Sequence, residues 1–156
     1  MSLGHFSGQH FQGLSSPVAN PCDRPAYATR ADVELLFGSS NVAKWADLNN
    51  DEDASDIAAR VCWALAESYA YMNNRLNGGP YTVPFSSPND EVISMSARYA
   101  GVILYDTRGI TDAADPPQHQ LSKHRDMVEM FIKQVLAGRV RLTGEEHAVT
   151  SPAVVK

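Results

Sequence analysis

The chain has little of several features that would assign it to a functional class at once. Its 156 residues contain two cysteines, Cys22 and Cys62, which share no short motif and have no histidine at ligand spacing. This usage argues against a disulfide framework and a zinc site, and it fits a reducing compartment. No uninterrupted apolar run approaches the roughly 18 residues that a membrane span needs. We therefore expect no membrane segment, and we expect no secretory signal because the first residues lack a basic and an apolar region.

Basic charge is also scarce. Lys and Arg number 13 against 18 Asp and Glu, which gives a formal net charge of -5. A protein that binds nucleic acid over its whole surface needs a positive net charge instead. The charges are spread unevenly, because residues 47–67 sum to -5 and residues 118–143 sum to +3. This asymmetry suits head-to-tail contact between copies, with scattered surface charge as the default explanation.

The composition divides the chain into a helical domain over residues 27–138, an extended N-terminal arm over 1–26 and a C-terminal arm over 139–156. Residues 1–22 contain no Asp, Glu, Lys or Arg, and such a stretch cannot bury enough apolar surface to become ordered alone. It carries a small repeat, HFSG at 5–8 followed by HFQG at 10–13. The candidate contacts of this arm with a neighbouring chain are His5, Phe6, His10 and Phe11.

Between the arms the hydrophobic periodicity is helical. Thr29 and Gly38 should bound one short helix, and Ser40 should cap a second one that carries Val42, Trp45 and Leu48. The longest helix is expected from about residue 53 or 55 to 77. A helix that is apolar on nearly every side, and therefore central, is expected from 90 to 105 or 106. A last helix should run from about 120 to 137, with an inner face of Leu121, Val128, Phe131, Ile132, Val135 and Leu136.

The sequence therefore predicts an all-α fold: a small helical bundle of three main helices and two short N-terminal ones, with unattached arms at both ends. No motif in it predicts catalysis, because G-x-S-x-G, a phosphate-binding glycine loop and H-E-x-x-H are all absent. We assign no catalytic, cofactor-binding or metal-binding residue.

An acidic stretch at 47–56 begins like a calcium loop, with oxygen ligands at alternating positions. The rest of the signature fails, since Glu52 stands where the loop needs Gly and Ala58 where it needs Glu. The preferred interpretation is a solvated loop that caps the following helix and favours its N-terminal dipole. A bound cation is the alternative.

Several segments, in their order, resemble the Mu-like phage head–tail connector proteins. Residues 27–38, YATRADVELLFG, resemble the opening Y-x-T-x-x-D-L-x-x-R-F-G of that family, and an Asp-rich loop and a long alanine-rich helix follow. Then come a Tyr-x-x-Pro segment at 81–84, an Ala-Arg-Tyr step at 97–99 and a closing A-G-R-x-x-L at 137–142. The resemblance covers about residues 27–142. The chain departs from it at Leu36, where Arg is common, and in an acidic loop without the glycines of many members.

This resemblance implies a structural virion protein and not an enzyme. It implies a small adaptor that forms a homo-oligomeric ring, typically of about twelve copies, under the portal protein of a tailed phage. The ring would lie in the virion neck, after assembly in the host cytoplasm, and would join the portal to a neck or tail-terminator protein. About twelve chains would sum to a formal charge of about -60, so DNA would pass through the channel without specific binding. We expect Arg139 and Arg141 to dock on the portal.

A second interpretation belongs to a different class: a small helical module that binds DNA, as a packaging or regulatory adaptor. The basic last helix favours it, and the acidic total and the lack of a helix-turn-helix signature disfavour it. An enzyme with an unrecognised site is the third interpretation.

Overall fold

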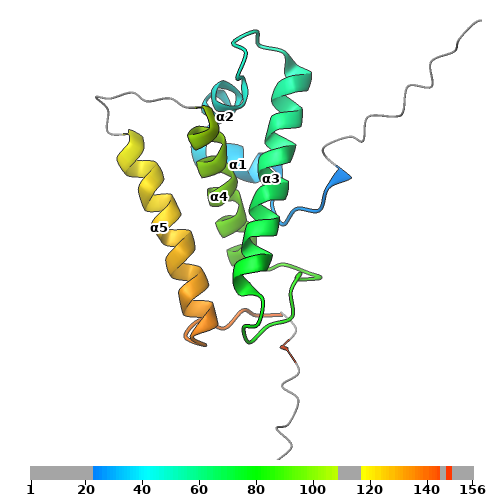
Figure 1. The fold of residues 1–156 in the computed structure, drawn as a ribbon, viewed down its shortest axis with the longest axis vertical. Coiled ribbons are helices and arrows are strands. Elements are labelled where there is room, and N and C mark those ends of the chain that lie inside the picture. Colours follow the sequence, from blue (N-terminus) through cyan, green and yellow to red (C-terminus); the bar gives the residue numbers. More distant parts are fainter. Residues whose placement is uncertain (1–22, 109–116, 145–146, 149–156) are drawn as a thin grey trace, which may run out of the picture.

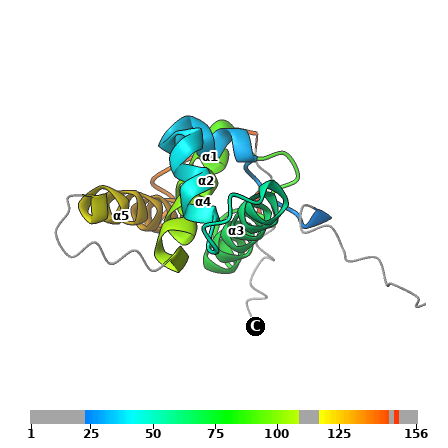
Figure 2. The same ribbon diagram turned by 90° about the horizontal axis from the view of Figure 1, so that it is seen from above.

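Helix α4 (Asp90–Arg108) lies at the centre of the fold, and four other helices pack around it (Figure 1). The computed structural model describes residues 23–108, 117–144 and 147–148. The surrounding helices are α1 (Arg30–Phe37), α2 (Ser39–Ala46), α3 (Ala54–Leu76) and α5 (Pro117–Leu136). Figures 1 and 2 show α3 and α5 on opposite flanks of α4, with α1 and α2 covering it from another side. Since these described elements are all helical, the predicted all-α bundle of three main and two short helices is confirmed.

The first helices begin where local side chains can satisfy their free backbone N–H groups. Thr29 is the N-cap of α1, and Asp32 completes a capping box with it. Asp53 is the N-cap of α3, as its carboxylate accepts hydrogen bonds from the N–H groups of Ser55 and Asp56. Helix α2 starts at Ser39 and its N-cap is Gly38, so the predicted cap at Ser40 is wrong by two residues.

Two later boundaries differ from those expected. Helix α4 continues to Arg108, and α5 begins at Pro117, earlier than the 120 predicted from periodicity alone. Proline suits the first turn of a helix because its fixed φ is already helical and its missing N–H would be unpaired there. Helix α2 ends at Ala46, which leaves Leu48 outside it and 45% exposed.

Close approach of α1 and α3 to α4 depends on small residues. A Cβ on Gly101 would lie 2.1 Å from Cε2 of Phe37, so only glycine lets this ring rest against α4. Ser68 of α3 is fully buried, and its hydroxyl donates to the carbonyl oxygen of Ser96 on α4 over 2.8 Å. This bond satisfies a hydroxyl that burial would otherwise penalise.

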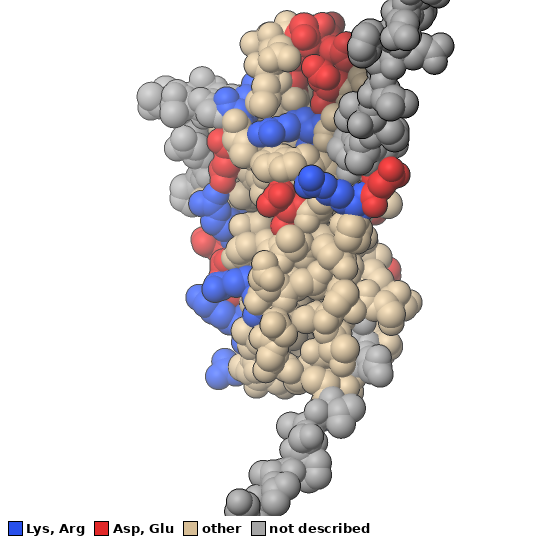
Figure 3. Space-filling model, turned by 45° about the vertical axis from the view of Figure 1, so that its right-hand side comes forward, with Lys and Arg blue, Asp and Glu red and all other residues tan. Residues whose placement is uncertain are grey.

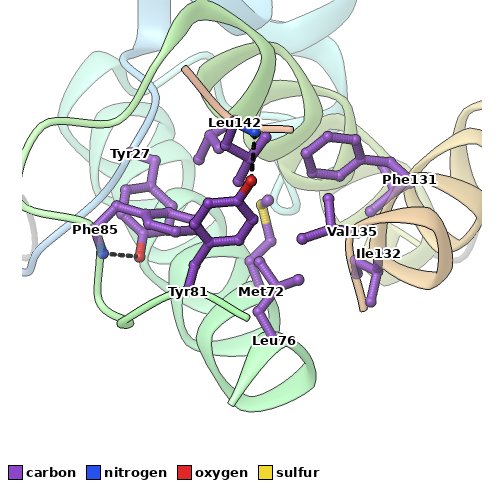
Figure 4. Close-up of a cluster of buried hydrophobic side chains, with 11 residues drawn as sticks. Tyr27, Met72, Leu76, Tyr81, Phe85, Phe131, Ile132, Val135 and Leu142 are labelled. Carbon is purple, nitrogen blue, oxygen red and sulfur yellow. Dashed lines mark hydrogen bonds between the residues drawn. The ribbon is translucent and has the colours of Figure 1, made fainter. Parts of the chain in front are cut away.

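The segment after α5 is extended but not free, which corrects the expectation of an unattached C-terminal arm for its described part. Leu142 is 3% exposed, and its N–H donates to the hydroxyl oxygen of Tyr81 over 2.8 Å (Figure 4). His147 stacks on the Tyr81 ring, with 4.8 Å between centroids, and the two residues form an isolated antiparallel bridge. Residues 140–148, as far as they are described, therefore belong to the bundle.

A buried cluster at this end of the bundle holds together segments that are far apart in the sequence (Figure 4). The Tyr27 hydroxyl accepts a hydrogen bond from the N–H of Phe85 over 2.9 Å and donates one to Asn73 of α3. The other members come from α3, α4, α5 and their connections: Met72, Leu76, Tyr81, Val92, Val128, Phe131, Ile132, Val135 and Leu142. The cluster fixes the chain before α1 and the chain after α5 to the same end.

Candidate interaction surfaces

The acidic segment, residues 47–56, uses its carboxylates to shape its own backbone. Asp47 accepts from the N–H groups of Asp51 and Glu52, both over 3.3 Å, and Asp51 accepts from that of Asp53 over 3.1 Å. Asn50 and Glu52 have positive φ angles of 56° and 55°, so the chain turns tightly here. The capping role expected for this loop is confirmed at Asp53.

The same geometry bears on the alternative of a bound cation. Within the described residues, no three His, Cys, Asp or Glu side chains converge as metal ligands would. The carboxylates of Asp47 and Asp53 accept hydrogen bonds from backbone N–H groups of the same segment. The segment forms an exposed acidic projection beside the start of α3.

The side of α5 that faces α3 and α4 is held by polar contacts. Glu129 pairs with Arg75 over 2.8 Å and also accepts a hydrogen bond from the Tyr71 hydroxyl. Arg125 pairs with Asp106. These charges are engaged inside one copy of the chain.

His124 lies on the same side of α5 at half-buried depth. An Arg98 guanidinium nitrogen lies 2.8 Å from its Nδ1, and the Phe37 ring contacts it edge-on at 4.9 Å between centroids. Burial, and after it the Arg98 charge, lowers the pKa of His124. The arrangement favours a neutral imidazole that accepts from the guanidinium, a structural contact between α4 and α5.

The outer face of α5 has a different character. We define it by Lys123, Asp126, Met127, Met130 and Lys133, all exposed. Met130 is 57% exposed and Met127 is 42% exposed, side by side on the helix as residues three apart are. Neither lysine has an ion pair within the described part of the chain. Sequence reasoning missed this apolar spot, although the methionines fall opposite the buried stripe.

The predicted inner face of α5 is confirmed with one exception. Leu121, Val128, Phe131, Ile132 and Val135 are buried, but Leu136 is 43% exposed. Leu136 covers the turn after α3 instead, where a Cβ on Gly79 would lie 2.7 Å from its Cδ2. It closes the edge of the bundle and is not part of its centre.

The predicted contact residues of the arms fall in two groups. Arg139 and Arg141 follow α5 and are exposed, and neither has an ion pair among the described residues. They stand beside Val140 and Leu142, which pack inward and so hold the two guanidinium groups outward. His5, Phe6, His10 and Phe11 lie outside the described residues.

Charge is segregated on the surface. Figure 3 shows acidic side chains gathered at the upper end of one flank, where the acidic segment and the start of α3 lie, above a lower part that is mostly uncharged. Farther along α3, Glu67 is exposed, and Arg60 stacks over the Trp63 ring at 4.1 Å. The uneven distribution seen in the sequence therefore becomes an acidic flank at α3 and a basic one at α5.

Cys62 corrects an expectation from the sequence. It is half-buried on α3 and is disulfide-bonded, whereas the two cysteines were expected to form no disulfide. The other cysteine of the chain, Cys22, lies outside the described residues. Two isolated cysteines 40 residues apart give no local signal of pairing, because pairing depends on the distance between their Cα atoms in the fold.

Comparison of the chain with protein-family models, with curated proteins and with solved structures finds no match. Among the helices that the structure describes, none is long and apolar enough to cross a membrane. What the chain does must therefore be argued from its own residues and surfaces.

Proposed function

We propose that this chain is a structural adaptor of a tailed-phage neck, a head–tail connector that forms a ring under the portal protein. The ring would extend the DNA channel and offer its far side to a neck or tail-terminator protein. The chain would act as one of about twelve identical subunits in the virion, after assembly in the host cytoplasm.

The observation that carries this proposal is that three segments resembling the connector family contact one another in the fold. Tyr27 opens the first of them, and its hydroxyl bonds the N–H of Phe85, directly after the Tyr-x-x-Pro segment. Tyr81 begins that segment, and its hydroxyl bonds the N–H of Leu142, which ends the last motif. Three matching segments separated by 58 and 61 residues thus hold one another in one buried cluster. The matching segments thus share one structural role in this fold, as motifs of a single family fold would.

The surfaces offer a second line of support. The acidic segment before α3 and the outer face of α5 both carry exposed charged side chains. The helices α3 and α5 lie on opposite flanks of α4, as subunits that join edge to edge require. The net charge of -5 favours a ring through which DNA slides without being held.

Binding to the portal tests the proposal. The purified chain should bind the portal protein of the same virion, and Arg139→Glu with Arg141→Glu should abolish this binding while the far-UV CD spectrum stays unchanged. Both side chains are exposed, so their reversal should leave the fold intact. The matched control is Arg24→Glu with Lys44→Glu, two exposed charges elsewhere, which should bind like the wild type. A wild-type chain that ignores the portal would overturn the proposal.

The second candidate function is a DNA-binding packaging or regulatory adaptor. It is favoured by four exposed cations that have no ion pair among the residues the structure describes: Lys123, Lys133, Arg139 and Arg141. A titration of duplex DNA at several salt concentrations separates the two. A connector should show little affinity at physiological salt, whereas tight binding with a steep salt dependence would favour the DNA-binding adaptor.

A further inference from the structure

The outer face of α5 is an exposed helix face with an apolar centre. Met127 and Met130 lie exposed between Lys123 and Lys133, and neither lysine has an ion pair within the described residues. A chain in isolation gains nothing from exposed methionines at this place. Interfaces between proteins have this composition, an apolar centre inside a polar rim, with Met enriched at the centre.

The opposite flank carries the complementary charge. The acidic flank consists of the acidic segment and the exposed residues of α3 that follow it, and its charge from 47 to 67 sums to -5. It also has an apolar side chain among its charges, because Leu48 is 45% exposed within the acidic segment. Glu52 and Glu67 are exposed and, within the described residues, have no ion pair.

We infer that the outer face of α5 docks on the acidic flank of a second copy of this chain. A second copy is the partner that fits, because the two surfaces of one chain have complementary charges and lie on opposite sides of it. The two surfaces differ and lie on opposite flanks of α4 (Figures 1 and 2), so each copy can give one surface and receive the other. Such head-to-tail contacts are heterologous, and they generate a ring when the rotation closes. The inference rests on the proposed function, for which it names the contact between neighbours.

A complementary pair of charge reversals tests this contact. Variant A carries Lys123→Glu and Lys133→Glu, which makes both of its surfaces acidic. Variant B carries Glu52→Lys, Asp56→Lys and Glu67→Lys. These three reversals, each worth two charges, take residues 47–67 from -5 to +1 and so make both surfaces of this variant basic. All five side chains are exposed and, within the described residues, have no ion pair, so their reversal should leave the fold intact. Each variant alone should repel its own copies, because like charges meet at every contact.

Mixed together, the two variants should assemble again. The acidic α5 of A then meets the basic flank of B, and the unchanged α5 of B meets the unchanged flank of A. The probe is the mass of the species by native mass spectrometry, with the portal protein added if the wild type needs it. We expect monomers from A and from B, and rings of alternating subunits from the equimolar mixture. Lys44→Glu, an exposed reversal on α2, should assemble like the wild type.

The outcomes separate this inference from the proposed function. If A alone and B alone form the same ring as the wild type, the contact is wrong and the connector proposal stands. If A and B stay monomeric in the mixture while the wild type assembles, the pairing of these two surfaces is also wrong. If the wild type assembles neither alone nor on the portal, the connector proposal fails and the contact fails with it.

Discussion

A guanidinium nitrogen of Arg98 lies 2.8 Å from Nδ1 of His124. The contact between α4 and α5 therefore places the permanent positive charge of Arg98 beside an imidazole that becomes positively charged when it binds a proton. Because the guanidinium can only donate, this contact needs a neutral imidazole with Nδ1 as acceptor. Protonation removes the acceptor and sets two positive charges against each other. The junction of the two helices is therefore sensitive to acid.

The first prediction is a loss of stability as the pH falls. The pKa of His124 in the folded chain lies below its ordinary value of 6.5, so the unfolded chain takes up the proton first. Stability from this group is fully present above the unfolded value and is lost as the pH falls through and below it. Urea unfolding at pH 7.5 and 5.5 should show this loss for the wild type and a smaller loss for His124→Gln. Equal losses in both proteins would show that His124 is not responsible.

The second prediction concerns the contact between Gly101 and Phe37. Gly101→Ala should lower the free energy of unfolding by about 1–3 kcal/mol, because the new Cβ cannot share space with the ring. Helix propensity acts in the opposite direction, since Ala in a helix interior is about 1 kcal/mol better than Gly. A more stable Gly101→Ala variant would therefore mean that the ring does not rest on α4.

The double variant Gly101→Ala with Phe37→Leu isolates that contact. Leucine is smaller at the point of overlap, so the two changes together should cost less than the sum of their separate effects. Chemical denaturation of the four proteins gives the coupling energy directly.

The third prediction concerns the hydroxyl of Tyr81. Tyr81→Phe should cost about 1–3 kcal/mol, because it leaves the buried N–H of Leu142 without its acceptor. Tyr105→Phe is the control, since Tyr105 is also buried and its hydroxyl has no hydrogen bond within the described residues. The loss should appear in thermal unfolding of the first variant only. If both variants lose the same stability, the attachment of residues 140–142 does not depend on this bond.

The helices were predictable because their signals are local. The buried stripe of α3, which includes Ile57, Val61 and Met72, repeats at helical spacing, and the Thr29 cap lies next to the helix that it starts. The central place of α4 also follows from its composition, since a helix that is apolar on most sides must be covered on most sides.

What the sequence did not predict depends on contacts between distant residues. Leu142 is attached through the hydrogen bond from its N–H to the hydroxyl of Tyr81, which lies 61 residues earlier. No sequence pattern within either segment predicts that hydrogen bond. The exposure of Met127 and Met130 is likewise a property of packing, because periodicity shows which side of α5 is buried and not what remains uncovered. The positions of the candidate surfaces could therefore be found only from the fold, whereas the charges that they carry could be counted in the sequence.

The measurement that tests the central claim most directly is the mass of the assembled full-length chain. Light scattering on the purified protein at high concentration, alone and with the portal protein of the same virion, should detect a large species, and negative-stain images should show it as a closed ring. We predict a ring of about twelve copies, either free or seated on the portal. A chain that remains monomeric under both conditions would contradict the connector proposal.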